Sequence, residues 1–393
     1  MMINKYPFFI YSLFLMLTLG TACSTQEKKQ EVSTTKYIDL TTFYVGTYTR
    51  SEGHVDGNAE GIYKIQVNEP TGEIAEKKLV TELINPSFLT YSPNKKYLFA
   101  VSELAHADEP TGFVYAYKIG KDSLEFINRL PTDGQAPCHI SIDQTGKFAF
   151  VANYVGGVVK MYRINEDGAL VALDKKQFEG SSTHPQQDSP HLHSVIISPD
   201  NQLAVAPDKG TDKIWLFTID HENGKLIPTE QAFLKIQDGA GPRHLVWSKN
   251  GKFCYVINEL DNTVNVIAYD KTKNVFTSIQ AISTLPTDFT GESYCADIRL
   301  HPNGKFLYGS NRGHDSIVMY EVNATTGKLT FIGTESTRGT FPRNFRIGKQ
   351  GKFLYAANQN SRNITSYAID ATTGQLNFTG FDFKIGTPVC IEF

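Results

Sequence analysis

Chemically versatile side chains occupy three positions counted from a polar turn that recurs about every fifty residues. Eight residues before the anchor residue of each turn, the chain carries Ser87, Cys138, His193, Arg243, Ala296 and Arg343. The next position carries Phe88, His139, Ser194, His244, Asp297 and Asn344. Eight residues after the anchor stand Glu103, Tyr154, Lys209, Glu259, Arg312 and Gln359. A purely structural repeat would keep one small or apolar residue at such positions, so this variation predicts a functional site.

Several of these side chains suit acid–base and oxyanion chemistry. His193 could take a proton from water near neutral pH, and Glu259 could either compete for that role or orient the imidazole. Arg243, Arg312 and Arg343 are permanent cations whose forked donors suit a carboxylate, a phosphate or a developing oxyanion. The alternative is a solvated polar rim, in which Arg243 and Glu259 form an ordinary ion pair at the mouth of one hairpin.

We predict His193, Glu259, Arg243 and Arg312 as catalytic residues. Polar residues at or beside the same positions are predicted to bind substrate, namely His139, His191, Lys209, His244, Asp297 and Arg343.

Metal and covalent chemistry have weaker signals. On a strand, His191 and His193 would share a face and could hold zinc together with His184 or His139. The spacing fixes no third ligand, so we predict no metal and no cofactor. The chain has no G-x-S-x-G elbow and no P-loop, which disfavours a covalent mechanism, although Cys138 leaves that alternative open.

The recurring turns belong to β-hairpins. In residues 241–260, two runs of apolar, β-branched and aromatic residues flank an Asn-Gly turn, a strong hairpin signal. Because the two strands are antiparallel, Arg243 and Glu259 should meet at the open end. Equivalent anchors fall at Lys95, Gly146, Asn201, Gly251, Gly304 and Gly351. Their spacings of 51, 55, 50, 53 and 47 residues indicate a repeated supersecondary unit.

A second repeated pair of strands lies between these hairpins. Its seven copies begin at Gly61, Gly112, Gly157, Asp212, Asn262, Asp315 and Arg362. Four strands per period without helical periodicity predict an all-β propeller. Residues 43–48 match only the second strand of the hairpin, and residues 387–392 match only the first. We therefore predict a seven-bladed β-propeller of four-stranded blades over residues 41–393, closed by pairing the N- and C-terminal strands.

Composition excludes some function classes. The chain has 393 residues, a net charge of -3 and no dominant basic stretch, so we predict no nucleic-acid partner. Cys138, Cys254, Cys295 and Cys390 are scattered and show no zinc-type pairing, which favours free thiols in the core. The sequence predicts no particular oligomeric state.

The first forty residues are typical of an exported protein. Lys5 precedes the apolar run 8–19, and residues 19–22 lead directly into Cys23, as in a bacterial lipoprotein signal. We predict a signal peptide over residues 1–22, lipidation of Cys23 and a polar tether over residues 23–40. The protein would then be exported, in the periplasm or at the outer membrane, and would contact a membrane only through its lipid anchor. A plain signal peptide with an incidental cysteine is the alternative.

Short motifs along residues 41–393 resemble one known family. They are YVGTYT near the start, Leu192-His193-Ser194 ahead of ISPDN, GAGPRHLVW followed by VINEL, SNRG, and FPRNF. Together they resemble the seven-bladed propeller 6-phosphogluconolactonases, which are similar in fold to the fungal carboxy-muconate lactonizing enzyme. The site of the latter, a His, an Arg, a Glu and a further Arg in chain order, matches His193, Arg243, Glu259 and Arg312. The His match is the loosest, because His191 is close by.

The resemblance implies metal-free hydrolysis of a sugar lactone to the aldonic acid. Arg243 and Arg312 would bind the lactone carbonyl or an anionic substituent, while His193 and Glu259 would activate water and protonate the leaving ring oxygen. An exported enzyme would more naturally meet an unphosphorylated lactone than the cytosolic phosphorylated one. Two other classes stay open: an exported binding or scaffold module without catalysis, and a lactonizing cycloisomerase.

Overall fold

The computed structural model describes residues 40–53, 55–105 and 110–393 of the chain. The chain divides into a unit of residues 1–38 and a unit of residues 39–393. The predicted signal peptide, the lipidation of Cys23 and the tether up to residue 39 lie outside the described residues.

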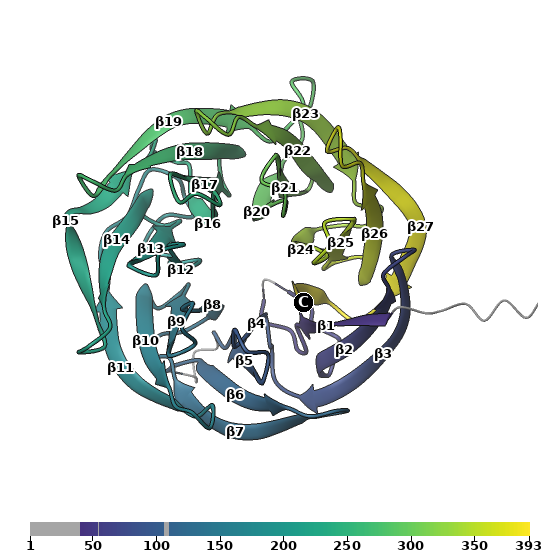
Figure 1. Cartoon of the computed structure of the whole chain (residues 1–393), viewed down its shortest axis with the longest axis horizontal. Coiled ribbons are helices and arrows are strands. Elements are labelled where there is room, and N and C mark those ends of the chain that lie inside the picture. Colours follow the sequence, from purple (N-terminus) through teal and green to yellow (C-terminus); the bar gives the residue numbers. More distant parts are fainter. Residues whose placement is uncertain (1–39, 54, 106–109) are drawn as a thin grey trace, which may run out of the picture. The chain divides into compact units, whose positions relative to one another are not determined.

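The second unit consists of seven sheets of four antiparallel strands, arranged in a ring (Figure 1). The predicted all-β, seven-bladed propeller is therefore confirmed. The described part of the chain has no helix that is both long and apolar enough to span a bilayer.

The blades are numbered along the chain, and their strands are given from the inside outward. Blade 1 contains β28 (Pro388–Glu392), β1 (Leu40–Thr47), β2 (Gly61–Asn68) and β3 (Glu73–Glu82). Blade 2 contains β4 (Phe88–Tyr91), β5 (Tyr97–Ser102), β6 (Phe113–Ile119) and β7 (Leu124–Pro131). Blade 3 contains β8 (Pro137–Ile142), β9 (Phe148–Asn153), β10 (Val158–Ile164) and β11 (Leu170–Gln177).

Blades 4 to 7 repeat the same order. Blade 4 contains β12 (Ile196–Ile197), β13 (Leu203–Asp208), β14 (Lys213–Asp220) and β15 (Lys225–Lys235). Blade 5 contains β16 (Pro242–Trp247), β17 (Phe253–Asn258), β18 (Thr263–Asp270) and β19 (Val275–Ser283). Blade 6 contains β20 (Tyr294–Leu300), β21 (Phe306–Arg312), β22 (Ser316–Val322) and β23 (Leu329–Ser336). Blade 7 contains β24 (Pro342–Ile347), β25 (Phe353–Asn358), β26 (Asn363–Ile369) and β27 (Leu376–Lys384).

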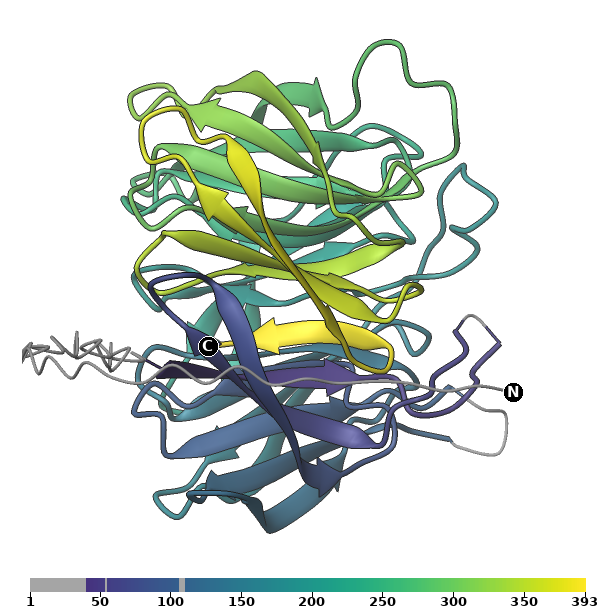
Figure 2. The ribbon, with the colours of Figure 1, turned by 90° about the vertical axis from the view of Figure 1, so that its right-hand side faces the viewer.

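The ring closes as predicted, by pairing of β28 with β1. Tyr44 faces Glu392 and Gly46 faces Cys390 in an antiparallel register. Figure 2 shows the C-terminal strand lying beside the first strand of the chain. Closure gives blade 1 four strands like the other blades and pairs the inner edge of β1.

Glycines in the outer turns help adjacent blades to pack. A Cβ on Gly374 would lie 2.4 Å from the Phe306 ring of blade 6, and one on Gly327 would lie 2.4 Å from the Phe253 ring of blade 5. Both glycines also have positive φ, 74° and 73°. Glycine is therefore required at the end of both Thr-Thr-Gly turns for two reasons: the backbone has a positive φ there, and an aromatic ring leaves no room for a Cβ.

The innermost hairpins of blades 3, 5 and 7 share a β-bulge at one position. The register shifts between Pro137 and His139, between Pro242 and His244, and between Pro342 and Asn344. The bulged residues are Cys138, Arg243 and Arg343, which stand eight residues before their turn anchors. A bulge changes the direction of a side chain and bends the strand. In these blades the bulge therefore falls at the position whose residue type varies from blade to blade.

Blade 4 departs from this pattern. Its inner strand β12 has only two residues, and Leu192 forms just an isolated bridge with Asp208. His191 and His193 therefore do not lie on a regular strand, and the strand-based argument for a shared histidine face does not apply to them.

Replacing Gly46 by Ala should destabilise the closed ring. A Cβ there would lie 2.2 Å from the Pro86 carbonyl oxygen of the adjoining segment and 3.2 Å from Leu89 Cγ. We expect overpacking to lower the free energy of unfolding by about 2 kcal/mol, measured by urea denaturation.

The matched control is Gly348→Ala, whose added Cβ would have Phe353 O as its nearest neighbour, at 3.6 Å. This substitution should change stability little. Equal unfolding midpoints for the two variants would contradict the close packing at the closure.

Candidate functional site

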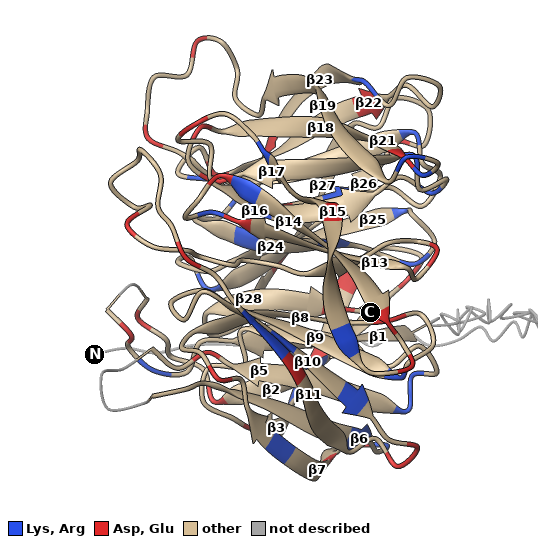
Figure 3. Cartoon of the chain, turned by 90° about the vertical axis from the view of Figure 1, so that its left-hand side faces the viewer, with Lys and Arg blue, Asp and Glu red and all other residues tan. Residues whose placement is uncertain are grey.

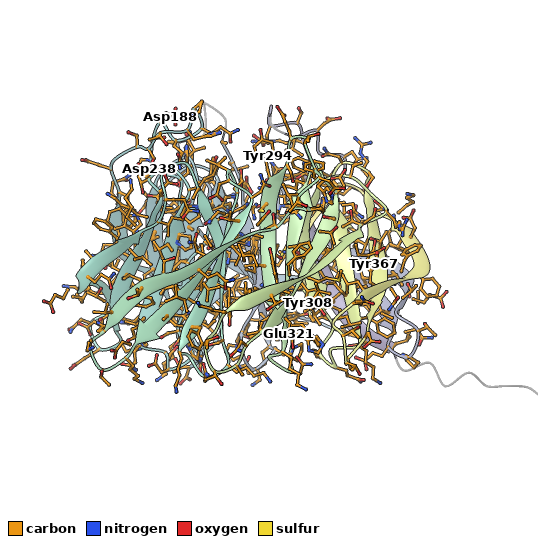
Figure 4. The ribbon with its side chains drawn as sticks, turned by 90° about the horizontal axis from the view of Figure 1, so that it is seen from above. Asp188, Asp238, Tyr294, Tyr308, Glu321 and Tyr367 are labelled. Carbon is orange, nitrogen blue, oxygen red and sulfur yellow. The ribbon has the colours of Figure 1, made fainter. Side chains whose placement is uncertain are left out.

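A cavity of about 300 Å³ opens at the end of the ring where inner strands such as β8, β16 and β24 begin. This is the face toward which Asp188, Asp238 and Tyr294 lie, opposite Tyr308 and Glu321 (Figure 4). Strands β16 and β24 both carry basic residues (Figure 3). The lining residues are Glu103, Ala105, Ala136, Cys138, Tyr154, Val155, Gln186, His193, Lys209, Glu259, Arg312, Phe341 and Arg343.

The Glu259 carboxylate binds three cations at once. Its Oε1 lies 2.9 Å from Lys209 Nζ. Its Oε2 lies 2.9 Å from Arg243 Nε and 3.0 Å from Arg312 Nη2. The four side chains come from blades 4, 5 and 6 and are all largely buried. Three of the four predicted catalytic residues therefore form one cluster.

Backbone carbonyls hold the two arginines in place. Arg243 Nη1 donates to the Ala296 carbonyl at 2.5 Å, and Arg312 Nη2 donates to the Cys295 carbonyl at 2.9 Å. Arg312 also lies over the Phe341 ring, with its Cζ 5.0 Å from the ring centroid. Both guanidinium groups thus have fixed orientations before any ligand binds.

The cluster has a surplus of positive charge. Burial alone would raise the pKa of Glu259, but the charges of Arg312, Lys209 and Arg243 hold it well below its ordinary value. Burial and the charge of Arg312 lower the pKa of Arg243 to about 10, so it stays protonated at neutral pH. One carboxylate among three cations leaves two positive charges uncompensated within the cluster. A buried surplus of this kind favours an anionic ligand or a developing oxyanion.

His193 lines the same cavity as a neutral imidazole. Burial, followed by the charge of Arg243, lowers its pKa well below the ordinary value. Its Nδ1 lies 3.6 Å from Cys138 Sγ, which also lies 3.6 Å from the carbonyl oxygens of Leu192 and His193. Since carbonyl oxygens only accept, these contacts are satisfied when the thiol donates to a carbonyl and Nδ1–H donates to sulfur. That tautomer leaves Nε2 unprotonated.

The Cys138 thiol itself is poorly suited to nucleophilic attack. Burial, together with the charge of Glu103, raises its pKa far above the ordinary value. The thiolate required of a nucleophile is therefore disfavoured.

Three predicted substrate-binding residues lie outside the cavity lining, in a layer with Asn344 and Arg299. Within it, His244 Nδ1 is 3.0 Å from Asp297 Oδ1, and the His139 and His244 ring centroids are 5.6 Å apart. Asp297 Oδ2 accepts hydrogen bonds from Asn344 Nδ2 at 2.7 Å and from Arg299 Nε at 3.0 Å. His139, His244 and Asp297 are thus placed to support the site from behind.

Electrostatics keep the two histidines of this layer neutral. Burial and the charge of Arg243 lower the pKa of His244 to about 4. Burial and the neighbouring His244 lower the pKa of His139 well below its ordinary value. For Asp297, burial opposes ionisation, but the Arg299 charge and the hydrogen bond with His244 act together to lower the pKa. Because His139 and His244 are neutral, they add no positive charge next to the cluster of Lys209, Arg243 and Arg312.

The remaining predicted substrate-binding residues lie around the cavity. Lys209 and Arg343 line it directly. Arg343 Nη2 is 3.9 Å from Glu103 Oε1, and its Cζ lies 5.4 Å from the centroid of the Tyr48 ring. His191 lies behind the wall, where its ring stacks on Tyr154 with centroids 4.4 Å apart.

Some lining residues were not among the predicted site residues. Tyr154 and Glu103 occupy the position eight residues after an anchor, so the repeat could have identified them. Phe341 stands two residues before Arg343 in the FPRNF motif. Gln186 comes from the irregular segment before β12 and has no counterpart in the other blades, so no repeat signal marks it. In the described residues, no three His, Cys, Asp or Glu side chains are grouped as metal ligands.

Comparison with known proteins gives consistent results. The family described as "Lactonase, 7-bladed beta-propeller" matches residues 42–393. A 6-phosphogluconolactonase from Bacillus subtilis is 36% identical over 310 residues, covering 78% of this chain and 84% of the relative. One from Formosa agariphila is 36% identical over 304 residues, covering 75% and 83%. The periplasmic gluconolactonase of Pseudomonas aeruginosa has a structure with a TM-score of 0.83 at 31% identity, covering 90% of this chain and 98% of that one.

Replacing Glu259 by Gln should destabilise the fold. The substitution leaves Lys209, Arg243 and Arg312 without their shared carboxylate, and we expect a loss of about 3 kcal/mol in the free energy of unfolding at neutral pH. The pKa of Glu259 is depressed in the folded state, so its contribution is complete above the unfolded-state pKa and is lost as the pH falls through the folded-state pKa. The stability difference between wild type and variant should narrow below about pH 4.

The control for this measurement is Glu125→Gln, which removes an exposed ion pair with Lys118 at 3.5 Å. We expect that variant to differ from wild type by less than about 0.5 kcal/mol. A Glu259→Gln protein as stable as the control across the pH range would show that the three cations do not depend on this carboxylate.

Proposed function

The chain belongs to the seven-bladed β-propeller lactonase family, and from that premise we propose that it hydrolyses the ester of a sugar lactone to the aldonic acid. The observation that carries the proposal is the cavity in which three cations share the Glu259 carboxylate beside a neutral His193. Lactone hydrolysis needs a base for water and positive charge at the carbonyl oxygen, and this cavity contains groups suited to both.

Arg312 is the best-placed group to stabilise the oxyanion. It lines the cavity, its guanidinium is held by a carbonyl and by Glu259, and it needs no reorganisation during the reaction. A single donor of this kind typically contributes about 3 kcal/mol to transition-state stabilisation. Arg243 is absent from the cavity lining and contacts Glu259, so its role is to position that carboxylate and to raise the local positive charge.

His193 is the base in this scheme, and Glu259 is not. The contacts of Cys138 leave His193 Nε2 free to accept a proton from water. Protonation of Glu259 would break its ion pairs with Lys209, Arg243 and Arg312, so this carboxylate accepts a proton poorly. This assignment refines the expectation that the two residues share the proton transfers.

The surplus positive charge favours a substrate that carries an anionic group. A phosphorylated aldonolactone, such as the substrate implied by the names of the curated relatives, meets that requirement. Lys209, Arg312 and Arg343 line the cavity and are the cations such a group would contact. We therefore propose 6-phosphogluconolactonase-like specificity, with unphosphorylated aldonolactones as the second candidate substrates.

The charge balance also bears on the non-enzymatic alternative. A binding or scaffold module would be expected to neutralise the charges at its mouth among themselves. Here Lys209, Arg243 and Arg312 share one carboxylate, and such a charge surplus costs folding energy that a purely structural site has no reason to retain.

We further propose that the enzyme is exported and lipid-anchored at Cys23. The support is the apolar run 8–19 followed by residues 19–22 and Cys23. The Pseudomonas aeruginosa relative is a periplasmic gluconolactonase, so the propeller occurs in that compartment in at least one relative.

The function can be tested with a pH-stat assay on phosphorylated and free aldonolactones, corrected for spontaneous opening. Wild-type protein should accelerate hydrolysis, most strongly with the phosphorylated lactones. His193→Gln should lower kcat by about 100-fold or more, because it removes the base.

The control, His221→Gln, changes a histidine whose Nε2 contacts the Asn201 carbonyl at a turn remote from the cavity. It should retain wild-type turnover. Wild-type rates that never exceed the spontaneous rate on any of these lactones would overturn the proposed function.

A further inference from the structure

We propose that Tyr154 is a catalytic residue that donates its hydroxyl proton to the ring oxygen leaving the lactone carbonyl. The inference rests on the proposed hydrolysis and concerns the proton that the ring oxygen takes up when its bond to the carbonyl carbon breaks. It is carried by the position of Tyr154 in the cavity wall and by the hydrogen bonding of its hydroxyl group.

Tyr154 is held rigidly at the cavity. It directly follows β9, and its backbone N–H donates to the Ala136 carbonyl at 2.8 Å. One ring face stacks on His191 with centroids 4.4 Å apart and planes 8° apart. The ring also meets His193 edge-on, with centroids 5.4 Å apart and planes at 72°. The His191 Nδ1 lies 3.0 Å from the Tyr154 carbonyl oxygen, which links the two residues a second time.

The hydroxyl group of Tyr154 has a proton to donate. Lys209 Nζ donates to the hydroxyl oxygen at 2.9 Å. An ammonium group has no acceptor, so the phenolic proton must point elsewhere. Among the residues that the structure describes, the Tyr154 hydroxyl has no hydrogen-bond acceptor. Because Tyr154 and Lys209 both line the cavity, the natural acceptor is an oxygen atom of the bound substrate.

Lys209 also makes the proton transfer favourable. Burial raises the pKa of Tyr154, which keeps the phenol protonated at neutral pH, and the Lys209 charge opposes this shift. The ammonium group would stabilise the phenolate formed by proton donation. Lys209 is itself fixed by Glu259 Oε1 and by Gln186 Oε1, each 2.9 Å from Nζ.

The steps balance in atoms and protons. Water attacks the lactone carbonyl carbon and gives a proton to His193 Nε2, forming a tetrahedral oxyanion beside Arg312. The oxyanion collapses, the bond between carbonyl carbon and ring oxygen breaks, and the ring oxygen takes the proton of Tyr154. The new carboxylic acid returns a proton to the Tyr154 phenolate and leaves as the aldonate. His193 releases its proton to solvent, so the net change is lactone plus water to aldonate plus a proton.

Tyr154→Phe tests this role, because it removes only the hydroxyl and keeps the ring that packs on His191 and His193. The assay compares an aldono-δ-lactone with the corresponding thiolactone, whose thiolate departs without needing a proton. We expect kcat to fall about 100-fold on the lactone and less than about threefold on the thiolactone, with KM for both within about threefold of wild type.

The control is Tyr115→Phe, which removes a hydroxyl contacted by the exposed side chain of Arg129, and it should turn over both substrates at wild-type rates. Equal losses of the Tyr154→Phe variant on lactone and thiolactone, or no loss on the lactone, would overturn the proton-donor role while leaving lactone hydrolysis by the wild type in place. Wild-type protein that hydrolyses neither substrate above the spontaneous rate would overturn the proposed function and this role with it.

Discussion

The contact of Glu259 with Lys209, Arg243 and Arg312 is the interaction on which the site depends. Three cations in a largely buried cluster repel one another strongly unless an anion separates them. The carboxylate reduces that repulsion but cannot cancel it, since it supplies one negative charge against three positive ones. The residual positive charge is therefore built into the folded protein, and it is available to a substrate anion or an oxyanion.

The propeller makes this arrangement possible by bringing distant segments to one point. Lys209 follows β13, Arg243 lies in β16, Glu259 follows β17, and Arg312 ends β21. No short loop could hold these groups, because their positions come from three blades. The β-bulge at Arg243 then re-aims its side chain. The layer that contains His244 and Asp297 supports the cluster without adding net positive charge, because His244 is neutral and Arg299 is paired with Asp297.

Much of the fold and of the site could be predicted from the sequence. The repeat of about fifty residues marks both the strands of each blade and the positions at the end of the channel where the site residues stand. The positions of the hairpin turns predicted the seven blades, the pairing of residues 43–48 with residues 387–392, and the contact between Arg243 and Glu259.

The sequence could not predict which of the candidate side chains line the cavity and which lie in the layer behind it. His139 and Asn344 stand one residue after Cys138 and Arg343, and only the latter two line the cavity. His244 and Asp297 occupy the same later position and also lie outside the lining. The charge sharing at Glu259 and the tautomer of His193 depend on distances of a few ångströms between blades, which no spacing in one sequence reveals. Gln186 lies in an irregular segment that does not repeat.

A crystal structure of the protein with a bound aldonate, such as gluconate or 6-phosphogluconate, tests the central claim most directly. The account predicts the ligand in the cavity with its carboxylate at Arg312, while Glu259 remains bound to Lys209 and Arg243. A ligand bound away from the cavity, or a Glu259 carboxylate released from its cations and turned toward the ligand as a base, would contradict it.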